Sequence, residues 1–417
     1  MSPTPPPAPL AIGERELVFM LALLQALHAF AVDAMLPALG VISSELNVAD
    51  PNKRQLIIGV FLIGLGLGSL FPGSLADRFG RKTVLLTCVA GYVVLSLASA
   101  LVNDIDALIA MRFVLGLMSA GLSVVPPAII RDRFEGDRMA RLQSLISVIF
   151  LVVPMLAPTV GQGIMLAIGW RWIFGAMGLL GLLMMVWVWA RLPETLHPEY
   201  RQPIDPKIIA ANMREAVMTR SAIGYVLGSA FMLGVGWGYI QSSQQLVAEH
   251  FGAGALFPVI FGGMALAMAC ANFTNSRIVE RFGARRVSHT ALLAYLVVGS
   301  LQLWMASSGH QTLWQFVIAQ SLTMMLMGFV GANFSSIALQ PFARIAGAAS
   351  SVQAFIRLAL ASLIGWAVGQ SYDQTALPFS QALVISGLMA LALVLFSERG
   401  RLFRRLNPPG SKGPHPV

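Results

Sequence analysis

The strongest constraint on this chain is a series of long apolar runs, six before and six after one polar stretch. The runs lie near residues 17–39, 55–76, 83–102, 107–130, 141–167, 171–190, 221–247, 256–278, 287–306, 313–338, 344–370 and 379–397. About 20 consecutive apolar residues are enough for a helix to cross a bilayer. The pattern therefore predicts an all-α integral membrane protein with twelve transmembrane helices in two six-helix halves.

Composition argues against the other classes of protein. Hydrophobic residues make up 56% of the chain and charged residues 11%, whereas soluble domains carry about 25% charged residues. This excludes a soluble enzyme and a fibrous or disordered chain. An outer-membrane barrel is disfavoured because its strands alternate polar and apolar residues. The net charge of +9 indicates basic loops facing an anionic cytoplasmic leaflet, and no nucleic-acid partner is expected.

The apolar runs divide the chain into five parts. They are a cytoplasmic tail (1–16), an N-terminal bundle (17–190), a cytoplasmic linker (191–220), a C-terminal bundle (221–397) and a second cytoplasmic tail (398–417). Of the 28 Lys and Arg residues, three fall on the outer side and two within spans, which leaves 23 on the cytoplasmic side. Because cytoplasmic loops are enriched in Lys and Arg, both termini are expected in the cytoplasm.

The sequence offers no pattern for a metal or a cofactor. Cys88 and Cys270 both lie inside apolar runs, and the six histidines are scattered. Neither a metal-ligand spacing nor a Walker-type nucleotide loop occurs. We therefore expect no metal, no cofactor and no direct use of ATP.

A short motif occurs once in each half. Residues 77–82 read Asp-Arg-Phe-Gly-Arg-Lys, and residues 280–285 read Glu-Arg-Phe-Gly-Ala-Arg. Each copy follows the second apolar run of its half, and the two copies are 203 positions apart. Two halves of the same orientation imply a pseudo-two-fold axis along the membrane normal, with a pathway between them.

The first copy belongs to a longer run that resembles the loop signature of the major facilitator superfamily at every defining position. That run is Gly73-Ser-Leu-Ala-Asp77-Arg78-Phe-Gly80-Arg81-Lys82. With the second copy and the six-plus-six layout, the resemblance covers nearly the whole chain. In this superfamily the loop gates alternating access, so the resemblance implies gating roles for Gly73, Asp77, Arg78, Gly80 and Arg81.

Further segments resemble drug–proton antiporters of the bicyclomycin/chloramphenicol-resistance (Bcr/CflA) type. The first span carries Asp33-Ala-Met-Leu-Pro-Ala, with Met35 where this group usually has Tyr. The fourth span carries Arg112-Phe-Val-Leu-Gly, in which Leu115 replaces the Gln of the group. The stretch 169–174, Gly-Trp-Arg-Trp-Ile-Phe, is also similar to this group.

The fifth span carries Ala-Pro158-Thr-Val-Gly161-Gln, a degenerate form of the antiporter motif Gly-Pro-x-x-Gly-Gly. The combined resemblance implies a multi-pass monomer in the bacterial inner membrane. It implies export of small amphipathic drugs or antibiotics in exchange for protons. The expected partners are this small-molecule substrate, protons and the lipid bilayer.

Asp33 is the only carboxylate expected deep in a span. Burying an acid in a bilayer costs about 2.5 kcal/mol or more, so such residues are seldom idle. An apolar environment favours the protonated form of a carboxyl group, which is the chemistry that proton coupling needs. The helix rise places Arg112 in the same membrane layer, where it would modulate Asp33. The other interpretation is a permanent ion pair that only holds two helices together.

Arg357 is a second arginine expected within a span, and no family motif covers it. The helix rise places it in the same layer as Asp33 and Arg112. This predicts a substrate contact that favours anionic or strongly hydrogen-bonding compounds. The other interpretation is that Arg357 caps backbone carbonyls or faces a wet cytoplasmic funnel.

The predicted substrate site combines these residues with side chains that can line a central cavity. It consists of Asp33, Met35, Arg112, Trp237, Tyr239, Gln241 and Arg357. The aromatic and amide members all belong to the seventh span, where a lipid-facing or interfacial position is an equal alternative.

The leading interpretation is a proton-coupled exporter, and one alternative within the transporter class stays open. A proton-coupled symporter or a facilitator for a small nutrient or metabolite could use the same fold, because the antiporter motif is degenerate. A non-transporting sensor would need a structured cytoplasmic domain, and no polar segment exceeds about 30 residues. An intramembrane enzyme is disfavoured because no Ser/His, paired-Asp or metal-ligand constellation occurs.

Overall fold

The computed structural model describes residues 12–404, except 49, 51, 135, 197–210, 212, 213 and 216. The N-terminal half contains α1 (Glu14–Asp33), η1 (Leu36–Ala38), α2 (Leu39–Glu45), η2 (Lys53–Gln55), α3 (Leu56–Gly68), α4 (Phe71–Phe79), α5 (Arg81–Ser99), α6 (Ile105–Arg133), α7 (Gly136–Ile168) and α8 (Arg171–Arg191). The C-terminal half contains α10 (Arg220–Gln244), the π-helical turn η4 (Gln245–His250), η5 (Gly254–Leu256), α11 (Phe257–Phe282), α12 (Ala284–Ser307), α13 (Leu313–Leu339), η6 (Gln340–Ile345), α14 (Ala346–Gln370) and α15 (Leu377–Ser397).

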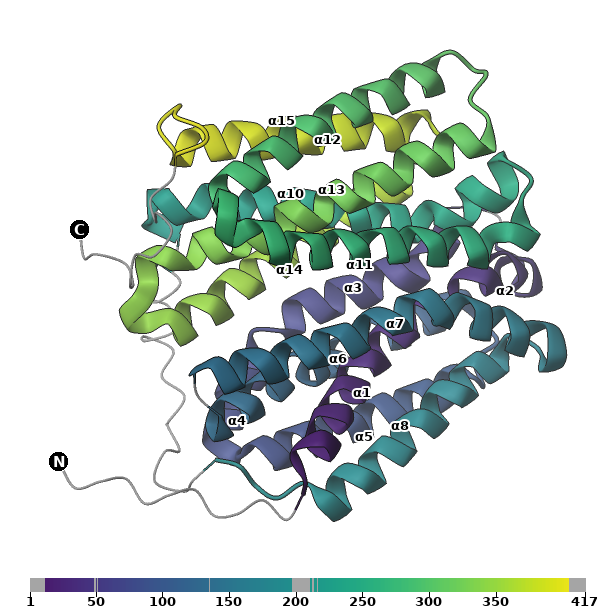
Figure 1. Ribbon diagram of the computed structural model, residues 1–417. Helices are drawn as coiled ribbons and strands as arrows, with labels where there is room; N and C mark the ends of the chain where they lie inside the picture. Colours follow the sequence, from purple (N-terminus) through teal and green to yellow (C-terminus); the bar gives the residue numbers. More distant parts are fainter. Residues whose placement is uncertain are drawn as a thin grey trace.

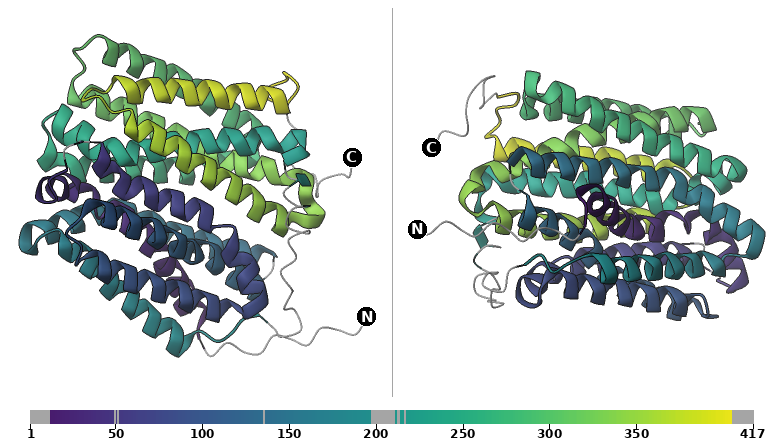
Figure 2. Two further views of the ribbon diagram at one scale, coloured as in Figure 1. Left: turned by 180° about the vertical axis from the view of Figure 1, so that it is seen from behind. Right: turned by 60° about the horizontal axis from the view of Figure 1, so that its bottom comes forward.

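The helices run side by side in two blocks. In Figure 1 the N-terminal half lies below the C-terminal half, with α5 and α8 on one outer face and α12 and α15 on the other. The halves meet where α3 packs against α14 and where α7 packs against α11. The two further views in Figure 2 show the same two blocks.

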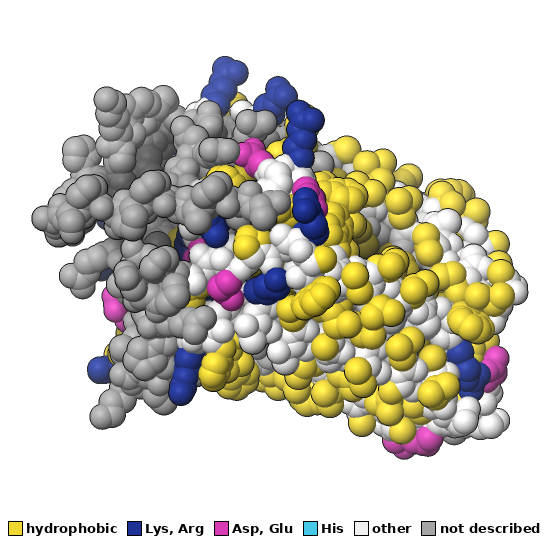
Figure 3. All heavy atoms as spheres, turned by 90° about the horizontal axis from the view of Figure 1, so that it is seen from below, with side chains coloured by type: hydrophobic (Ala, Val, Ile, Leu, Met, Phe, Trp, Pro, Cys, Tyr) yellow, Lys and Arg dark blue, Asp and Glu magenta, His cyan; other side chains and the backbone are white. Residues whose placement is uncertain are grey.

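The helices have the length and surface of a membrane-embedded bundle. Among the described residues, ten helices are long and apolar enough to cross a membrane, and α3 with α4 adds a span bent by 48°. The fifth predicted run corresponds to α7, whose shorter apolar stretch is Val152–Ile168. Figure 3 shows a broad hydrophobic surface between two ends where charged side chains gather. These helices confirm the predicted all-α, membrane-spanning architecture.

The first span is not the continuous helix that the apolar run predicts. Helix α1 ends at Asp33, a turn follows, and Pro37 lies in the short 3-10 helix η1. Proline has no N–H, and its ring clashes with the carbonyl four residues earlier, which here belongs to Asp33. The spacing Asp-x-x-x-Pro therefore breaks the span at the carboxylate.

The two ends of the bundle carry different short segments. The inner end carries the turns at Gly80 and Gly283, and the outer end carries η2 and η4. The names follow the orientation predicted from the basic residues.

Candidate functional site at the interface of the two halves

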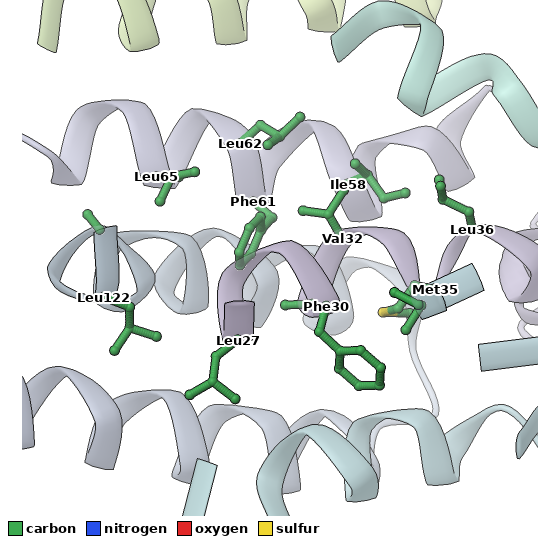
Figure 4. Packing of buried hydrophobic residues seen from close by; sticks show 14 of the residues in the cluster. Leu27, Phe30, Val32, Met35, Leu36, Ile58, Phe61, Leu62, Leu65 and Leu122 are labelled. Atoms are coloured by element: carbon green, nitrogen blue, oxygen red, sulfur yellow. The ribbon is translucent and has the colours of Figure 1, made fainter. Parts of the chain in front are cut away.

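Asp33 is the last residue of α1 and lies inside the bundle. It is only 4% exposed, and among the described side chains no ion pair within 4.0 Å includes it. Its neighbours along the chain are apolar. Figure 4 shows the packing around the break by labelled side chains of α1, η1, α3 and α6: Leu27, Phe30, Val32, Met35, Leu36, Ile58, Phe61, Leu62, Leu65 and Leu122. A carboxyl group thus sits at a helix break in an apolar wall.

Arg112 does not form the predicted contact with Asp33. Its Nε donates to the carbonyl of Ile57 at 2.9 Å and its Nη2 donates to that of Ala31 at 2.8 Å. The guanidinium also lies over the Phe61 ring, 4.5 Å from the centroid. The break in α1 explains this arrangement, because the last carbonyls of a helix lack intrahelical donors and attract a cation. Arg112 therefore caps α1 and ties it to α3.

The predicted antiporter motif meets the broken span directly. A Cβ atom at Gly161 of α7 would collide with the backbone carbonyl of Ala34, the residue after Asp33. Pro158 lies one turn earlier in α7 and is buried. Met35 is fully buried on the other side of the break. Glycine at position 161 is thus what allows α7 to touch the chain beside Asp33.

Gln241 and Trp237 both belong to α10. Gln241 is fully buried, and neither of its amide atoms has a hydrogen-bond partner. Its Oε1 would be 2.6 Å from a Cβ at Gly59 of α3, and its Nε2 would be 3.2 Å from one at Gly365 of α14. Trp237 is half-buried and packs against the same Gly365. Gln241 therefore reaches the N-terminal half, whereas the contact of Trp237 lies within its own half.

Tyr239 belongs to a different environment. Its hydroxyl donates to Sδ of Met264 at 2.9 Å. Its ring packs against Phe261, Phe316 and Phe379, with centroids 5.6 to 6.4 Å away. These partners come from α11, α13 and α15, so Tyr239 packs inside the C-terminal half and not at the interface.

Arg357 lies nearer to the inner end than the helix-rise estimate placed it. The carbonyl of Leu358, its neighbour on α14, would be 2.9 Å from a Cβ at Gly66 of α3. The Arg112 guanidinium instead lies beside Ile57 and Phe61 of α3. At 1.5 Å per residue the two arginines differ in height by roughly 10 Å. The structure therefore places the two arginines at different heights along α3, and not in one shared layer.

At the outer end an ion pair joins the halves. Arg54 of η2 donates to Glu249 of η4 at 2.6 Å. Arg54 is only 7% exposed. Among the described residues this is the ion pair that links the two halves. The Glu249 side chain is 40% exposed, so solvent screens part of the attraction between the two charges.

Amides and a tyrosine extend this contact. Asn52 donates to the Tyr372 carbonyl at 2.9 Å and accepts, through its own carbonyl, from Gln370 at 3.0 Å. The amides of Gln55 and Gln245 bind each other. Burial raises the pKa of Tyr372 to about 12, so its hydroxyl remains a donor to the Gln245 carbonyl, 3.3 Å away, at neutral pH. We call this set and the Arg54–Glu249 pair the outer interlock.

At the inner end of the N-terminal half, Arg81 gathers several carboxylates. Its guanidinium pairs with Asp77 at 2.6 Å and Asp132 at 2.9 Å. Glu194 accepts from the backbone N–H of Arg81 at 2.8 Å and so caps the start of α5. Gly80 has φ +100°, and a Cβ there would collide with the Glu194 carboxylate. Among the described side chains, Asp77 therefore pairs with an arginine of its own half.

Two other residues of the loop signature have looser surroundings. A Cβ at Gly73 would be in ordinary contact with Val124, 3.7 Å away. Arg78 is exposed and lies over the Phe79 ring, 5.2 Å from its centroid. Arg81, and not Arg78, is thus the basic residue that connects the helices.

The C-terminal half has a matching contact at its inner end. Arg285 of α12 donates to Glu398 at 2.6 Å and to Gln340 at 2.9 Å. Glu398 also accepts from the Tyr225 hydroxyl at 2.7 Å. Gly283 before α12 has φ +88°, as Gly80 does before α5. The two loop motifs therefore fold alike.

The sequence alone did not predict the glutamates that contact Arg81 and Arg285, nor the outer interlock. Glu194 and Glu398 are 204 positions apart, as are Arg81 and Arg285, which is one more than the 203 positions between the loop motifs. A search near that spacing could have found the two glutamates. The interlock had a weaker signal, the amides clustered at the end of the seventh apolar run. Partners from distant segments give no local pattern.

Residues 21–365 match the family model that is described as the Major Facilitator Superfamily. The chain belongs to this superfamily. The match covers most of the chain, in agreement with the loop signature and the helix arrangement.

Relatives resemble the chain over most of its length. A bicyclomycin resistance protein homolog of Haemophilus influenzae is 28% identical over 364 residues, covering 87% of this chain and 90% of the relative. The uncharacterized transporter YdgK of Bacillus subtilis is 29% identical, with 89% and 93% covered. The multidrug resistance protein MdtL of Klebsiella pneumoniae is 28% identical, with 82% and 85% covered. These relatives agree with the subgroup indicated by the motif residues.

Solved structures share the fold at low identity. A D-xylose–proton symporter superposes with a TM-score of 0.72 at 15% identity, covering 91% of this chain and 96% of the symporter. A peptide transporter solved with sulfate gives 0.73 at 15% identity, with 92% and 94% covered. Likeness at this level concerns the fold alone.

Proposed function

We propose that this protein is a secondary transporter that exports small amphipathic drugs or antibiotics in exchange for protons. The observation that carries the proposal is Asp33, a buried carboxyl group without an ionic partner among the described side chains, at a break in a membrane span. Such acids in membranes are expensive and usually functional. A broken span also brings backbone polar groups to a pathway through the bilayer. Asp33 is therefore the proton carrier in this proposal.

The names of the relatives support export of drugs. One is named for bicyclomycin resistance and another for multidrug resistance. The mostly apolar surroundings of Asp33, including Met35, suit amphipathic compounds, since flexible methionine side chains adapt to varied ligands. Trp237 and Gln241 complete the proposed site from the C-terminal half.

Alternating access is supported by the difference between the two ends. Among the described residues, the hydrogen bonds that join the halves lie in the outer interlock. At the inner end, Arg81 and Arg285 each bind carboxylates of their own half. We infer a state closed on the outside, and transport requires this interlock to open. Arg112 keeps α1 attached to α3 during that movement.

The proposed location is the bacterial inner membrane, with both termini in the cytoplasm. The excess of Lys and Arg on one side of the predicted spans supports this orientation. Reporter fusions at each terminus test it, and an external signal from either reporter would reverse the assignment of inner and outer ends.

Proton release is the direct test of antiport. Purified protein in weakly buffered detergent is mixed with lipophilic antibiotics while a pH dye is monitored. Binding of a substrate to an antiporter displaces the proton from Asp33, so we expect acidification that is absent in Asp33→Asn. If no antibiotic causes release, and a nutrient is instead taken up down a proton gradient, the protein is a symporter.

A further inference from the structure

Arg357 is a charged residue within a membrane span whose donors are mostly unused. Its Nη1 donates to Oγ of Ser335 on α13 at 2.6 Å. Its Nε is buried and has no hydrogen-bond partner. Among the described side chains no carboxylate pairs with it. Arginine keeps its charge and offers five N–H donors, so this cation retains capacity for an anionic ligand.

A purely structural role does not need this charge. One turn earlier on α14, the neutral Gln353 makes a similar tie to α13 by donating to the Ala338 carbonyl at 3.0 Å. The position 204 residues earlier, in the N-terminal half, is Val153. The packing that the two halves share therefore does not require a cation at this position. A charge in a span is costly, and a neutral residue serves the packing as well.

The location of Arg357 suits a compound that arrives from the inner end. The backbone of Leu358, the residue after Arg357, lies against Gly66 of α3. Arg357 therefore belongs to the part of α14 that packs against the N-terminal half. Ser335 is four residues before the inner end of α13. The exposed Leu363 of α14 lies about 120° away from Arg357 around the helix. The Arg357 guanidinium reaches Ser335 of α13 instead.

We propose that Arg357, positioned by Ser335, binds the anionic or acceptor-rich end of the exported compound. The substrates that it favours are amphipathic molecules with a carboxylate or a comparable strong acceptor. Hydrogen bonds between a guanidinium and a carboxylate are charge-assisted and often paired, which gives them strength and direction. This inference rests on the proposed transport function and assigns the substrate class that the C-terminal half selects.

Two probes separate this role from a structural one. Nalidixate is an amphipathic carboxylate, and tetraphenylphosphonium is a lipophilic cation without acceptors. Binding of each to the purified full-length protein is measured by tryptophan fluorescence for the wild type, Arg357→Met and Arg357→Lys. The control Arg220→Gln removes one positive charge from the exposed start of α10.

We expect Arg357→Met to weaken nalidixate binding by roughly tenfold to a hundredfold, the effect of losing a charge-assisted hydrogen bond. Tetraphenylphosphonium should bind as well as before or more tightly. Arg357→Lys should fall between the two, and Arg220→Gln should match the wild type. Unchanged binding of tetraphenylphosphonium shows that Arg357→Met is folded.

The inference would be overturned if both variants lost affinity for the two probes equally, or if Arg357→Met bound nalidixate as tightly as the wild type. A wild type that exports tetraphenylphosphonium with proton exchange but does not bind nalidixate would also overturn it, and the proposed function would stand. A wild type that exports neither probe and releases no proton with any antibiotic would instead contradict the proposed function itself.

Discussion

The two halves of the molecule share residues that fix the packing of their helices, but they differ in the charged residues that lie inside the bundle. Glu194 accepts from the backbone N–H of Arg81, and Glu398 pairs with the guanidinium of Arg285. Each of these residues lies 204 positions from its counterpart, one more than the offset of the loop motifs. The same spacing relates Gly161 of α7 to Gly365 of α14, and both glycines face a closely packed helix. The frame has thus been kept in both copies.

Interior charges do not follow this repeat. At the same spacing, Asp33 corresponds to Trp237, Arg112 corresponds to Phe316, and Arg357 corresponds to Val153. A buried charge is costly wherever it lies, so one copy can keep it only where it has a use. The proposed proton site therefore belongs to the N-terminal half, and the proposed anion contact belongs to the C-terminal half.

The largest effect is expected from removing the acid of the N-terminal half. Asp33→Asn cannot carry a proton, so export driven by a proton gradient in proteoliposomes should fall to the background. Asp106→Asn is the control, because Asp106 forms only an exposed pair with Lys53 at the outer end and such pairs contribute about 0–1 kcal/mol. If Asp33→Asn exported substrate at the wild-type rate, the proposed proton site in the N-terminal half would be wrong.

The inner-end contacts provide the next comparison. Arg285 has one carboxylate partner among the described side chains, whereas Arg81 keeps Asp77 and Asp132 when Glu194 is lost. Glu398→Gln should therefore lower the free energy of unfolding by about 3 kcal/mol, as for a broken buried pair. Glu194→Gln should cost about 1–2 kcal/mol in lost hydrogen bonds to a charged cap. Thermal unfolding in detergent measures both, and the reverse order would contradict the comparison.

A third test uses the glycines that let helices touch. Gly161→Ala would drive a methyl group into the Ala34 backbone, whereas the nearest atom to a Cβ at Gly365 is a side-chain atom of Trp237, 2.9 Å away. We expect a loss of about 1–3 kcal/mol for Gly161→Ala from overpacking and a smaller loss for Gly365→Ala. Gly163→Ala is the control, because nothing lies within 4 Å of a Cβ there. Equal stability of all three in thermal unfolding would show that α7 adjusts freely.

The smallest effect is expected at Asp77. Its carboxylate is 43% exposed and pairs with Arg81 in the same half, so Asp77→Asn should change stability by at most about 1 kcal/mol. Turnover should slow while the substrate affinity in detergent stays the same, since the loop lies far from Asp33. A large loss of affinity with normal turnover would place Asp77 in the substrate site.

The all-helical class, the membrane setting and the repeated loop motif could all be predicted from the sequence. These features rest on local or periodic information: apolar runs as long as a bilayer is thick, and a motif whose spacing recurs. The sequence also singled out Asp33, because an acid in an apolar run is visible without a structure. The break beside it was readable from Pro37, although the apolar run alone predicted a continuous helix.

The contacts between side chains of separate segments became known only from the packing of the helices. Arg112 was expected beside Asp33 and instead donates to carbonyls of α1 and α3, since the end of α1 supplies a free acceptor that a linear count of residues cannot show. Tyr239 turned into its own half, and Arg357 proved to lie closer to the inner end. The outer interlock joins residues almost 200 to more than 300 positions apart. Hydrogen bonds and ion pairs depend on distances of a few ångströms between separate segments, which only the packing of the helices fixes.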